Sequence, residues 1–512
     1  MRSPAFYPDA PESVEIAESH ISWVFLAGNR AYKLRKPVVF PFLDYGTAQR
    51  RREMCEEEVR LGRRLAPDLY VGVRPLQRAA RGWALGAPGD PGEEHVVEMR
   101  RFDEARTLAA LIERGEADTA VVGAVARRIA DFHEASEAVA GSFDAGAVAA
   151  TVGENFGTLL PYADVVGAGE LAAAHRFAMA FLHARHELLE DRVTRGWVRD
   201  CHGDLRAEHV IVAGGVVEVF DPLEFDPELR RIDVSADLAF LVMDLIAMGA
   251  DELAATLVAE YEAAGGDHGG RPLLFFYAAY RAWVRTKVAC LRAGELALGE
   301  RGGALAEARR FAAVGRRLAW LTRMPLVLVV CGGAATGKTH LAEPLAAISG
   351  LPRLSSDVVR KELAGIGPTE RARAADYSEE ASLHTYRELG ARAAAAPDGA
   401  IVDATFRSRA HRAAFAEAFG GRAVFVECIA SAAVVAERAA RRELDPGGES
   451  DATAAIAVRQ LAEFEPLDEI PPENHLPLRA DRPLDDVLGA LEAWLDLRAI
   501  SDAVGSSAGE RS

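Results

Sequence analysis

The sequence predicts an α+β domain followed by an α/β domain with a parallel sheet, and three observations lead to this prediction. Short strand-like runs and one charged helical segment fill the first 100 residues, and mostly helical sequence follows up to residue 321. From residue 326 to about 498, apolar strands alternate with helices, which is the pattern of a parallel sheet. A glycine-rich stretch, G-x-x-x-x-G-K-T, opens this second part at residues 332–339.

The first domain is expected over residues 1–322. Its predicted strands are short runs of apolar and β-branched residues, the first two joined by a turn at Gly28-Asn29: residues 21–26, 30–34 and 96–99. Its predicted helices show helical periodicity or high alanine content: residues 47–65, 104–190 and 238–321. Residues 198–225 are expected to form short strands and loops around polar residues.

The second domain is expected over residues 323–498, with Pro325 marking the joint that precedes its first strand. Its predicted strands are apolar runs of three to seven residues: residues 326–331, a short one near 353–354, 400–402 and 423–429. The serine- and glycine-rich end, residues 499–512, is predicted to be a disordered tail.

The composition of the chain indicates which partners and which cellular compartment to expect. The net charge of -18 argues against broad binding to nucleic acid, because its phosphates would be repelled. No stretch approaches the roughly 18 apolar residues of a membrane span. Without a C-x-x-C pair, the cysteines are expected to be free thiols in a reducing compartment: Cys55, Cys201, Cys290, Cys331 and Cys428. We therefore expect a cytoplasmic protein without a membrane segment; the sequence leaves the oligomeric state open.

The glycine-rich stretch predicts a phosphate-binding P-loop, because it joins a buried strand to a helix. Its glycines allow backbone N–H groups to turn toward phosphate oxygens, and its lysine and threonine suit the β/γ-phosphates and Mg²⁺. ATP and Mg²⁺ are therefore the expected cofactors. The predicted nucleotide-binding residues are Gly332, Gly333, Ala334, Ala335, Thr336, Gly337, Lys338 and Thr339, with Thr339 also a metal ligand.

Four polar residues downstream favour phosphoryl transfer. Asp357 and Arg360 are three residues apart, so they share a helical face beyond the second strand, where a carboxylate can accept a hydroxyl proton. Asp357 or a neighbouring serine is alternatively a helix cap. Asp403 ends a buried strand and can orient Mg²⁺ through water, bind an acceptor, or simply begin a turn. Arg441 precedes a glycine-rich segment, residues 445–451, that suits a lid; a solvated helix face is the alternative.

These residues together resemble small P-loop kinases of the polynucleotide-kinase, gluconate-kinase and shikimate-kinase type. They are most similar to the AAA-like ATP-binding domain that bacteria fuse behind an aminoglycoside-phosphotransferase-like domain. The resemblance covers about residues 326–495. It implies that Asp357 is the general base, Arg360 an acceptor contact and Arg441 the lid arginine.

A second motif, His202-Gly203-Asp204, is followed by a strand that ends at Asp221. This layout is typical of a kinase catalytic loop with a metal-binding aspartate. Residues 15–300 resemble the bilobal aminoglycoside-phosphotransferase and protein-kinase-like fold. The resemblance implies that Asp204 is the catalytic base and Asp221 the Mg²⁺ ligand. It further implies that Lys33 binds nucleotide phosphates and pairs with Glu58 or, in another helix register, Glu57.

The first domain departs from that family at the position of its second metal ligand. Where the family has asparagine, this sequence has His209, and a neutral imidazole is a poorer ligand for Mg²⁺ than an oxygen. No glycine-rich phosphate loop precedes Lys33. The domain is therefore expected to be a weak kinase, a kinase that uses its metal differently, or a pseudokinase that binds nucleotide or substrate.

The sequence as a whole predicts an ATP-dependent phosphotransferase that acts in the P-loop domain on a hydroxyl of a small molecule. A nucleic-acid end is the second choice of acceptor. A regulatory ATP-binding protein with a pseudokinase sensor, and a bifunctional kinase with both domains active, are the alternatives.

Overall fold

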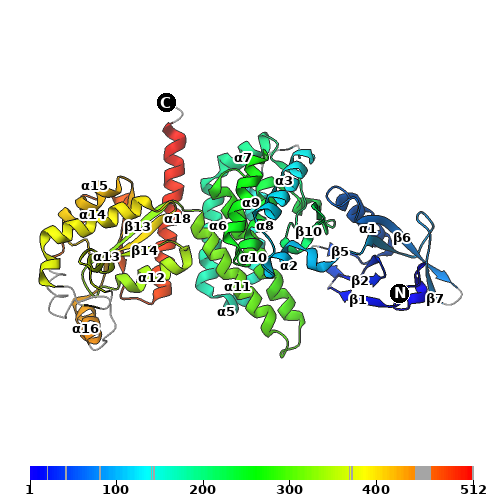
Figure 1. Cartoon of the computed structure of the whole chain (residues 1–512), viewed down its shortest axis with the longest axis horizontal. Coiled ribbons are helices and arrows are strands. Elements are labelled where there is room, and N and C mark those ends of the chain that lie inside the picture. The colour runs from blue at the N-terminus through cyan, green and yellow to red at the C-terminus, as the bar shows by residue number, and fades with distance from the viewer. Residues whose placement is uncertain are drawn as a thin grey trace. The chain divides into compact units, whose positions relative to one another are not determined.

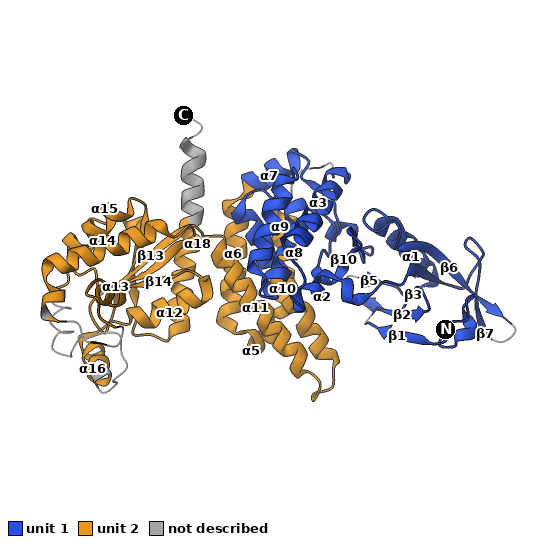
Figure 2. Cartoon of the chain, in the orientation of Figure 1, with its two compact units in different colours: residues 1–144, 187–281 blue, residues 145–186, 282–512 orange. Residues whose placement is uncertain are grey.

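The computed structural model describes the chain except residues 20, 41–42, 80–81, 140, 142–143, 368–369, 371–372, 444–462 and 510–512 (Figure 1). Its chain contacts divide it into two compact units, residues 1–144 with 187–281 and residues 145–186 with 282–512 (Figure 2). The boundary predicted after residue 322 falls inside the second unit, and the domain limits drawn from the sequence stay a prediction.

Unit 1 begins with a six-stranded antiparallel sheet in the order β1-β2-β3-β8-β6-β7. The predicted hairpin is present, because Val24 pairs with Lys33 and Gly28 turns the chain at φ +58°. Apolar residues of α1 such as Cys55 and Val59 pack on this sheet against Val97. The bounds are β1 Val14–Glu18, β2 Ser22–Ala27, β3 Arg30–Arg35, β6 Tyr70–Ala79, β7 Gly82–Leu85, β8 Glu94–Arg100 and α1 Ala48–Gly62.

The rest of unit 1 is mostly helical, and the unit also contains three two-stranded ladders. Helix α8 is almost wholly buried, and Leu238 and Leu241 have no exposed surface. The helices are α2 Leu108–Glu113, α3 Thr119–Ala135, α7 His186–Thr194, α8 Val234–Ala247, α9 Asp251–Ala263 and the first part of α10 Arg271–Glu295. The ladders join β4 Val39–Phe40 to β5 Leu43–Asp44, β9 Val198–Asp200 to β12 Arg231–Asp233, and β10 Val210–Ala213 to β11 Val216–Val219.

Unit 2 contains a five-stranded parallel sheet in the order β14-β15-β13-β16-β17. The central strand β13 is buried along its whole length, as its continuous apolar run predicts. The strands are β13 Leu326–Cys331, β14 Arg353–Ser355, β15 Gly399–Asp403, β16 Ala423–Ile429 and β17 His475–Arg479. The sequence analysis missed β17, because Pro477 interrupts its short run.

Helices cover both faces of this parallel sheet, so its carboxyl edge is where polar residues collect. Residues of α11 Gly302–Leu321, α12 Lys338–Ser349 and α18 Leu484–Gly509 pack on one face. Residues of α13 Ser356–Leu363, α14 Glu379–Ala395 and α15 Arg409–Phe419 pack on the other. The unit also contains α4 Ala145–Leu159, α5 Ala163–Val166, α6 Ala168–Ala184 and α16 Ala432–Glu443.

Three further predictions from the sequence can be compared with the structure. All five cysteines are free, as predicted, and all five are buried. No helix among the described residues is long and apolar enough to cross a membrane. The stretch predicted to be a disordered tail, residues 499–512, overlaps the last part of α18, and residues 510–512 lie outside the described residues.

Candidate nucleotide sites

The P-loop follows β13, and its backbone conformation depends on glycines at two positions with positive φ angles. Gly332 has φ +132°, and a Cβ there would lie 2.6 Å from the carbonyl oxygen of Cys428. Gly337 has φ +111° and leads directly into α12. Within the loop, the Lys338 Nζ donates to the Gly333 carbonyl at 2.8 Å, and the Thr336 hydroxyl donates to the same oxygen at 2.9 Å. These two hydrogen bonds join parts of the P-loop to each other and hold the Lys338 ammonium against the loop backbone.

The predicted metal ligands of unit 2 lie together at the end of β15. The Thr339 hydroxyl donates to Asp403 Oδ2 at 2.9 Å, and Asp403 is 5% exposed. Arg353 Nη2 donates to the same carboxylate oxygen at 3.0 Å. This hydroxyl and this carboxylate supply the oxygen donors that Mg²⁺ prefers, so the residues present fit that ion. The sequence analysis did not identify Arg353, because a single arginine at the start of a short strand belongs to no motif.

Asp357 and Arg360 lie on α13, which starts immediately after β14. Ser355 occupies the N-cap position, so Asp357 lies inside the first helical turn and is not the cap. Arg360 is buried, with its guanidinium over the Tyr377 ring at 4.7 Å and Nη1 donating to the Asp376 carbonyl at 2.9 Å. Arg360 therefore fastens residues 376–377 to α13, and its role as an acceptor contact stays a prediction.

The arginines of α16 have different surroundings. Arg441 is exposed. Arg438 instead reaches the P-loop, since Nη1 donates to the Thr336 carbonyl and Nη2 to the Ala480 carbonyl, each at 3.0 Å. The glycine-rich segment predicted as a lid, residues 445–451, lies outside the described residues. The lid role was predicted for Arg441, whereas the described contact with the P-loop belongs to Arg438.

In unit 1, Lys33 bridges two carboxylates. Its Nζ donates to Glu58 Oε1 at 3.0 Å and to Asp221 Oδ1 at 2.5 Å, so Glu58 rather than Glu57 lies beside it. Burial lowers the pKa of Lys33, but the charges of Asp221 and Glu58 outweigh burial and raise it above its usual value. Burial raises the pKa of Asp221, but the charge of Lys33 and its hydrogen bond outweigh that effect and lower the pKa. The pair of Lys33 with Glu58 corresponds to the Lys–Glu pair of protein kinases, and the roles of Lys33 and Asp221 toward nucleotide and metal stay predictions.

A second buried cation, which the sequence analysis missed, extends this cluster. Arg35 Nη2 donates to Glu58 Oε2 at 2.5 Å, and its Nη1 lies 2.6 Å from Glu224 Oε1. The Tyr45 hydroxyl donates to that glutamate at 2.5 Å. Arg35 has no exposed side-chain surface, so strand β3, helix α1 and the segment after Asp221 are joined in one ionic cluster. Alternation along β3 places Lys33 and Arg35 on one face, which is the signal that was available.

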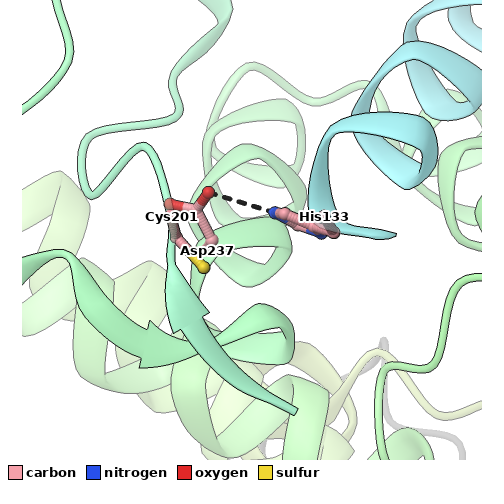
Figure 3. A group of neighbouring side chains, drawn as sticks. All are labelled: His133, Cys201 and Asp237. Atoms are coloured by element: carbon pink, nitrogen blue, oxygen red, sulfur yellow. Dashed lines mark hydrogen bonds and ion pairs between the residues drawn. The ribbon is translucent and has the colours of Figure 1, made fainter. Parts of the chain in front are cut away.

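The buried carboxylate of Asp237 holds the H-G-D loop of residues 202–204. Figure 3 shows Asp237 with its neighbours His133 and Cys201. Asp237 accepts hydrogen bonds from the backbone N–H groups of His202 at 3.0 Å and Gly203 at 2.8 Å. His133 Nε2 lies 3.1 Å from the same carboxylate. Burial raises the pKa of Asp237, but the hydrogen bond and charge of His133 outweigh it and lower the pKa to about 2. Both carboxylate oxygens are occupied, so this cluster supports the loop rather than binding a metal.

His209 faces Asp221 across the expected metal position. Its Nδ1 lies 2.9 Å from the Asp204 carbonyl oxygen, so Nδ1 carries a proton and Nε2 carries the lone pair. Nε2 lies 3.1 Å from Arg206 Nη2 and 3.8 Å from Asp221 Oδ2. Burial raises the pKa of Asp204, but the charge of Arg206 outweighs it and lowers the pKa. One carboxylate and one imidazole fit Mg²⁺ less well than an all-oxygen set.

Fold and sites together define a protein with a kinase-like unit and a P-loop ATP-binding domain. The family described as AAA domain matches residues 327–467. The chain belongs to the family of the uncharacterized protein Rv2004c of Mycobacterium tuberculosis and Mb2027c of Mycobacterium bovis. It is 33% identical to each over 465 residues, which cover 88% of this chain and 90% of theirs.

Solved kinase structures are similar to separate parts of the chain. A gluconokinase from Sinorhizobium meliloti is 22% identical with a TM-score of 0.27, covering 36% of this chain and 97% of its own. A choline/ethanolamine kinase family protein from Mesorhizobium loti is 15% identical with a TM-score of 0.33, covering 61% and 96%. Aminoglycoside 2'-phosphotransferase-IIIa, solved with GDP, is 13% identical with a TM-score of 0.34, covering 59% and 93%.

Proposed function

We propose that the protein is an ATP-dependent phosphotransferase that transfers the γ-phosphate to a hydroxyl of a small molecule in its P-loop domain. The observation that carries this proposal is the set of groups at one edge of the parallel sheet. Lys338 and Thr339 begin α12 after the loop that follows β13. Asp403 ends β15, and Asp357 follows β14. These three strands are neighbours, and their carboxyl ends meet at one edge.

Some of these residues would balance the charge of the phosphates, and one would accept the proton of the acceptor. Lys338 exchanges its bond with the Gly333 carbonyl for the terminal phosphates, where its charge is needed as the γ-phosphate departs. Thr339 and Asp403 would hold Mg²⁺, which when bound neutralises the β- and γ-phosphate oxygens. Asp357 accepts the proton of the attacking hydroxyl. Arg438 keeps the loop backbone in place through the Thr336 carbonyl.

Unit 1 supports two alternatives. The first is a regulatory ATP-binding protein with a sensing pseudokinase, which His209 favours because imidazole stands at the second metal position. The second is a bifunctional kinase, which the pairing of Lys33 with Glu58 and Asp221 favours. Both alternatives leave the P-loop domain as a nucleotide site and differ in whether Asp204 performs chemistry.

A screen of small hydroxyl compounds with the full chain, following ADP release and product mass, tests the proposal. We expect a stimulated rate that Asp357→Asn lowers at least ~100-fold, in line with loss of a general base, and that Lys338→Ala abolishes. Asp204→Asn should leave this rate unchanged. If Asp357→Asn retains the full rate with a compound that is turned over, the assigned base is wrong. If only Asp204→Asn loses it, the chemistry belongs to unit 1.

A further inference from the structure

Arg206, two residues after the H-G-D motif, is held beside His209 in unit 1. Its Nη2 lies 3.1 Å from His209 Nε2, and its Nε lies 3.1 Å from Asp204 Oδ1. Its Nη1 pairs with the carboxylate of Glu208. The Arg206 side chain is 14% exposed, so most of the guanidinium is surrounded by protein. These contacts fix a positive charge beside the position where the kinase layout has its second metal ligand.

The lone pair of His209 that could bind a metal ion is already used. Nδ1 lies 2.9 Å from the Asp204 carbonyl oxygen and donates its proton to it, which leaves the lone pair on Nε2. A guanidinium has N–H donors and no acceptor, so Arg206 Nη2 donates to this lone pair. His209 is buried, and its ring lies against those of His202 and Phe220. An ion at Nε2 would therefore have to displace the guanidinium of Arg206.

Asp221 is the remaining metal ligand of the kinase layout, and its carboxylate can serve one ion. In that layout the strand-end aspartate and the catalytic-loop asparagine together hold two Mg²⁺ ions. The Asp221 side chain is 39% exposed, so a metal-bound nucleotide can reach it. Its Oδ2 lies 3.8 Å from His209 Nε2, the nitrogen that accepts from Arg206. A second dication in this space would meet the guanidinium charge at short range and be repelled. The residues present therefore do not fit a second Mg²⁺ ion.

We infer that Arg206 takes the place of the second divalent ion, so that unit 1 binds a nucleoside triphosphate together with a single divalent ion. This inference goes beyond the proposed function, which concerns the P-loop, and it rests on the predicted nucleotide site at Lys33. A guanidinium stays charged at every physiological pH and matches the geometry of phosphate oxygens. Arg206 therefore supplies positive charge where the second ion would otherwise neutralise phosphate. Asp221 would hold the ion that enters with the nucleotide.

Counting bound metal ions tests this inference. The full chain carries Lys338→Ala, which removes the P-loop cation, and is saturated with Mn²⁺ and a non-hydrolysable ATP analogue. Electron paramagnetic resonance counts the bound Mn²⁺, and the ratio to bound nucleotide is the measured quantity. We expect one Mn²⁺ per bound nucleotide. Adding Lys33→Met should abolish nucleotide binding, which assigns the counted ions to unit 1.

Two further variants of the Lys338→Ala protein separate the effect of the guanidinium from that of the imidazole. His209→Asn combined with Arg206→Gln supplies an amide oxygen and removes the cation, so the ratio should rise to two. His209→Asn alone retains Arg206 and is the matched control, so its ratio should stay at one. Because the ratio counts ions per bound nucleotide, protein that fails to fold does not contribute to it.

A ratio of two before either of these substitutions would overturn the inference, because the site would then accept a second ion beside the guanidinium. A ratio of two in His209→Asn alone, or of one in the double variant, would also overturn it, because Arg206 would not be the group that excludes the ion. Absence of nucleotide binding by the Lys338→Ala protein, or binding that persists after Lys33→Met, would refute the site in unit 1 itself. The proposed function is judged separately, by acceptor phosphorylation in the chain with Lys338 intact.

Discussion

At the scale of single residues, buried carboxylates organise unit 1. Asp237 has no exposed surface and accepts two backbone N–H groups of the H-G-D loop, while His133 approaches the same carboxylate. The sequence analysis identified the H-G-D loop but not Asp237, which holds it, because Asp237 lies in an apolar helix far from the H-G-D motif. The same is true of Arg35 and Glu224, whose pairing joins residues 189 positions apart. Motifs predicted which residues face a ligand, and only the folded chain shows which residues hold them.

Asp237 yields a pH-dependent prediction. Its folded-state pKa of about 2 lies below the roughly 3.9 of an unfolded aspartate, so the unfolded chain binds the proton more readily. The stabilisation is therefore complete above about pH 5 and is lost as pH falls toward 2; it amounts to about 2–3 kcal/mol. We expect Asp237→Asn to destabilise unit 1 at pH 7 and to differ much less from the parent protein near pH 2.5, below the unfolded pKa. Urea unfolding between pH 7 and pH 2.5 measures this; a difference that stays constant from pH 5 to pH 2.5 would refute the linkage.

At the scale of elements, the continuous apolar runs were the most predictable part of the parallel sheet. Strands β13, β15 and β16 lie where those runs predicted, because a strand buried on both faces needs apolar residues throughout. β17 was missed because His475 and Pro477 break its pattern. Residues of β17 and of the segment 464–472 line a pocket beside Gly332 and Gly333 of the P-loop. The sequence analysis could not predict this pocket, because it placed neither of these two segments.

The P-loop backbone itself supplies a prediction at this scale. Gly332→Ala places a Cβ 2.6 Å from the Cys428 carbonyl at a φ that disfavours side chains, so the loop must shift away from β16. We expect nucleotide affinity of the P-loop to fall at least ~tenfold, equivalent to about 1.4 kcal/mol. Gly489→Ala in α18 is the control, because its Cβ would meet open space within a helix. Titration with a fluorescent ATP analogue reads both variants, and equal affinities would contradict the expected clash.

At the scale of the whole molecule, two unrelated folds in one chain each contain a lysine that is predicted to bind nucleotide phosphates. Lys33 and its carboxylates belong wholly to unit 1, and Lys338 belongs wholly to unit 2. The sequence indicated both, since each lysine lies in a local pattern: a hairpin strand in one case and a glycine-rich loop in the other. Among the described residues, these contacts of each lysine lie within its own unit, so we expect each site to bind its nucleotide independently.

Two separate sites predict two bound nucleotides per chain. Calorimetric titration of the full chain with a non-hydrolysable ATP analogue should give a stoichiometry near two. Lys338→Ala and Lys33→Met should each reduce it to about one, because each removes the cation that meets the phosphates in one unit while leaving the other untouched. Lys36→Met, three residues beyond Lys33 and paired with Glu18, is the matched control and should retain two. A parent stoichiometry of one that Lys33→Met does not alter would show that unit 1 is not a nucleotide site, and His209 would then mark a unit that has kept the kinase fold without its ligand.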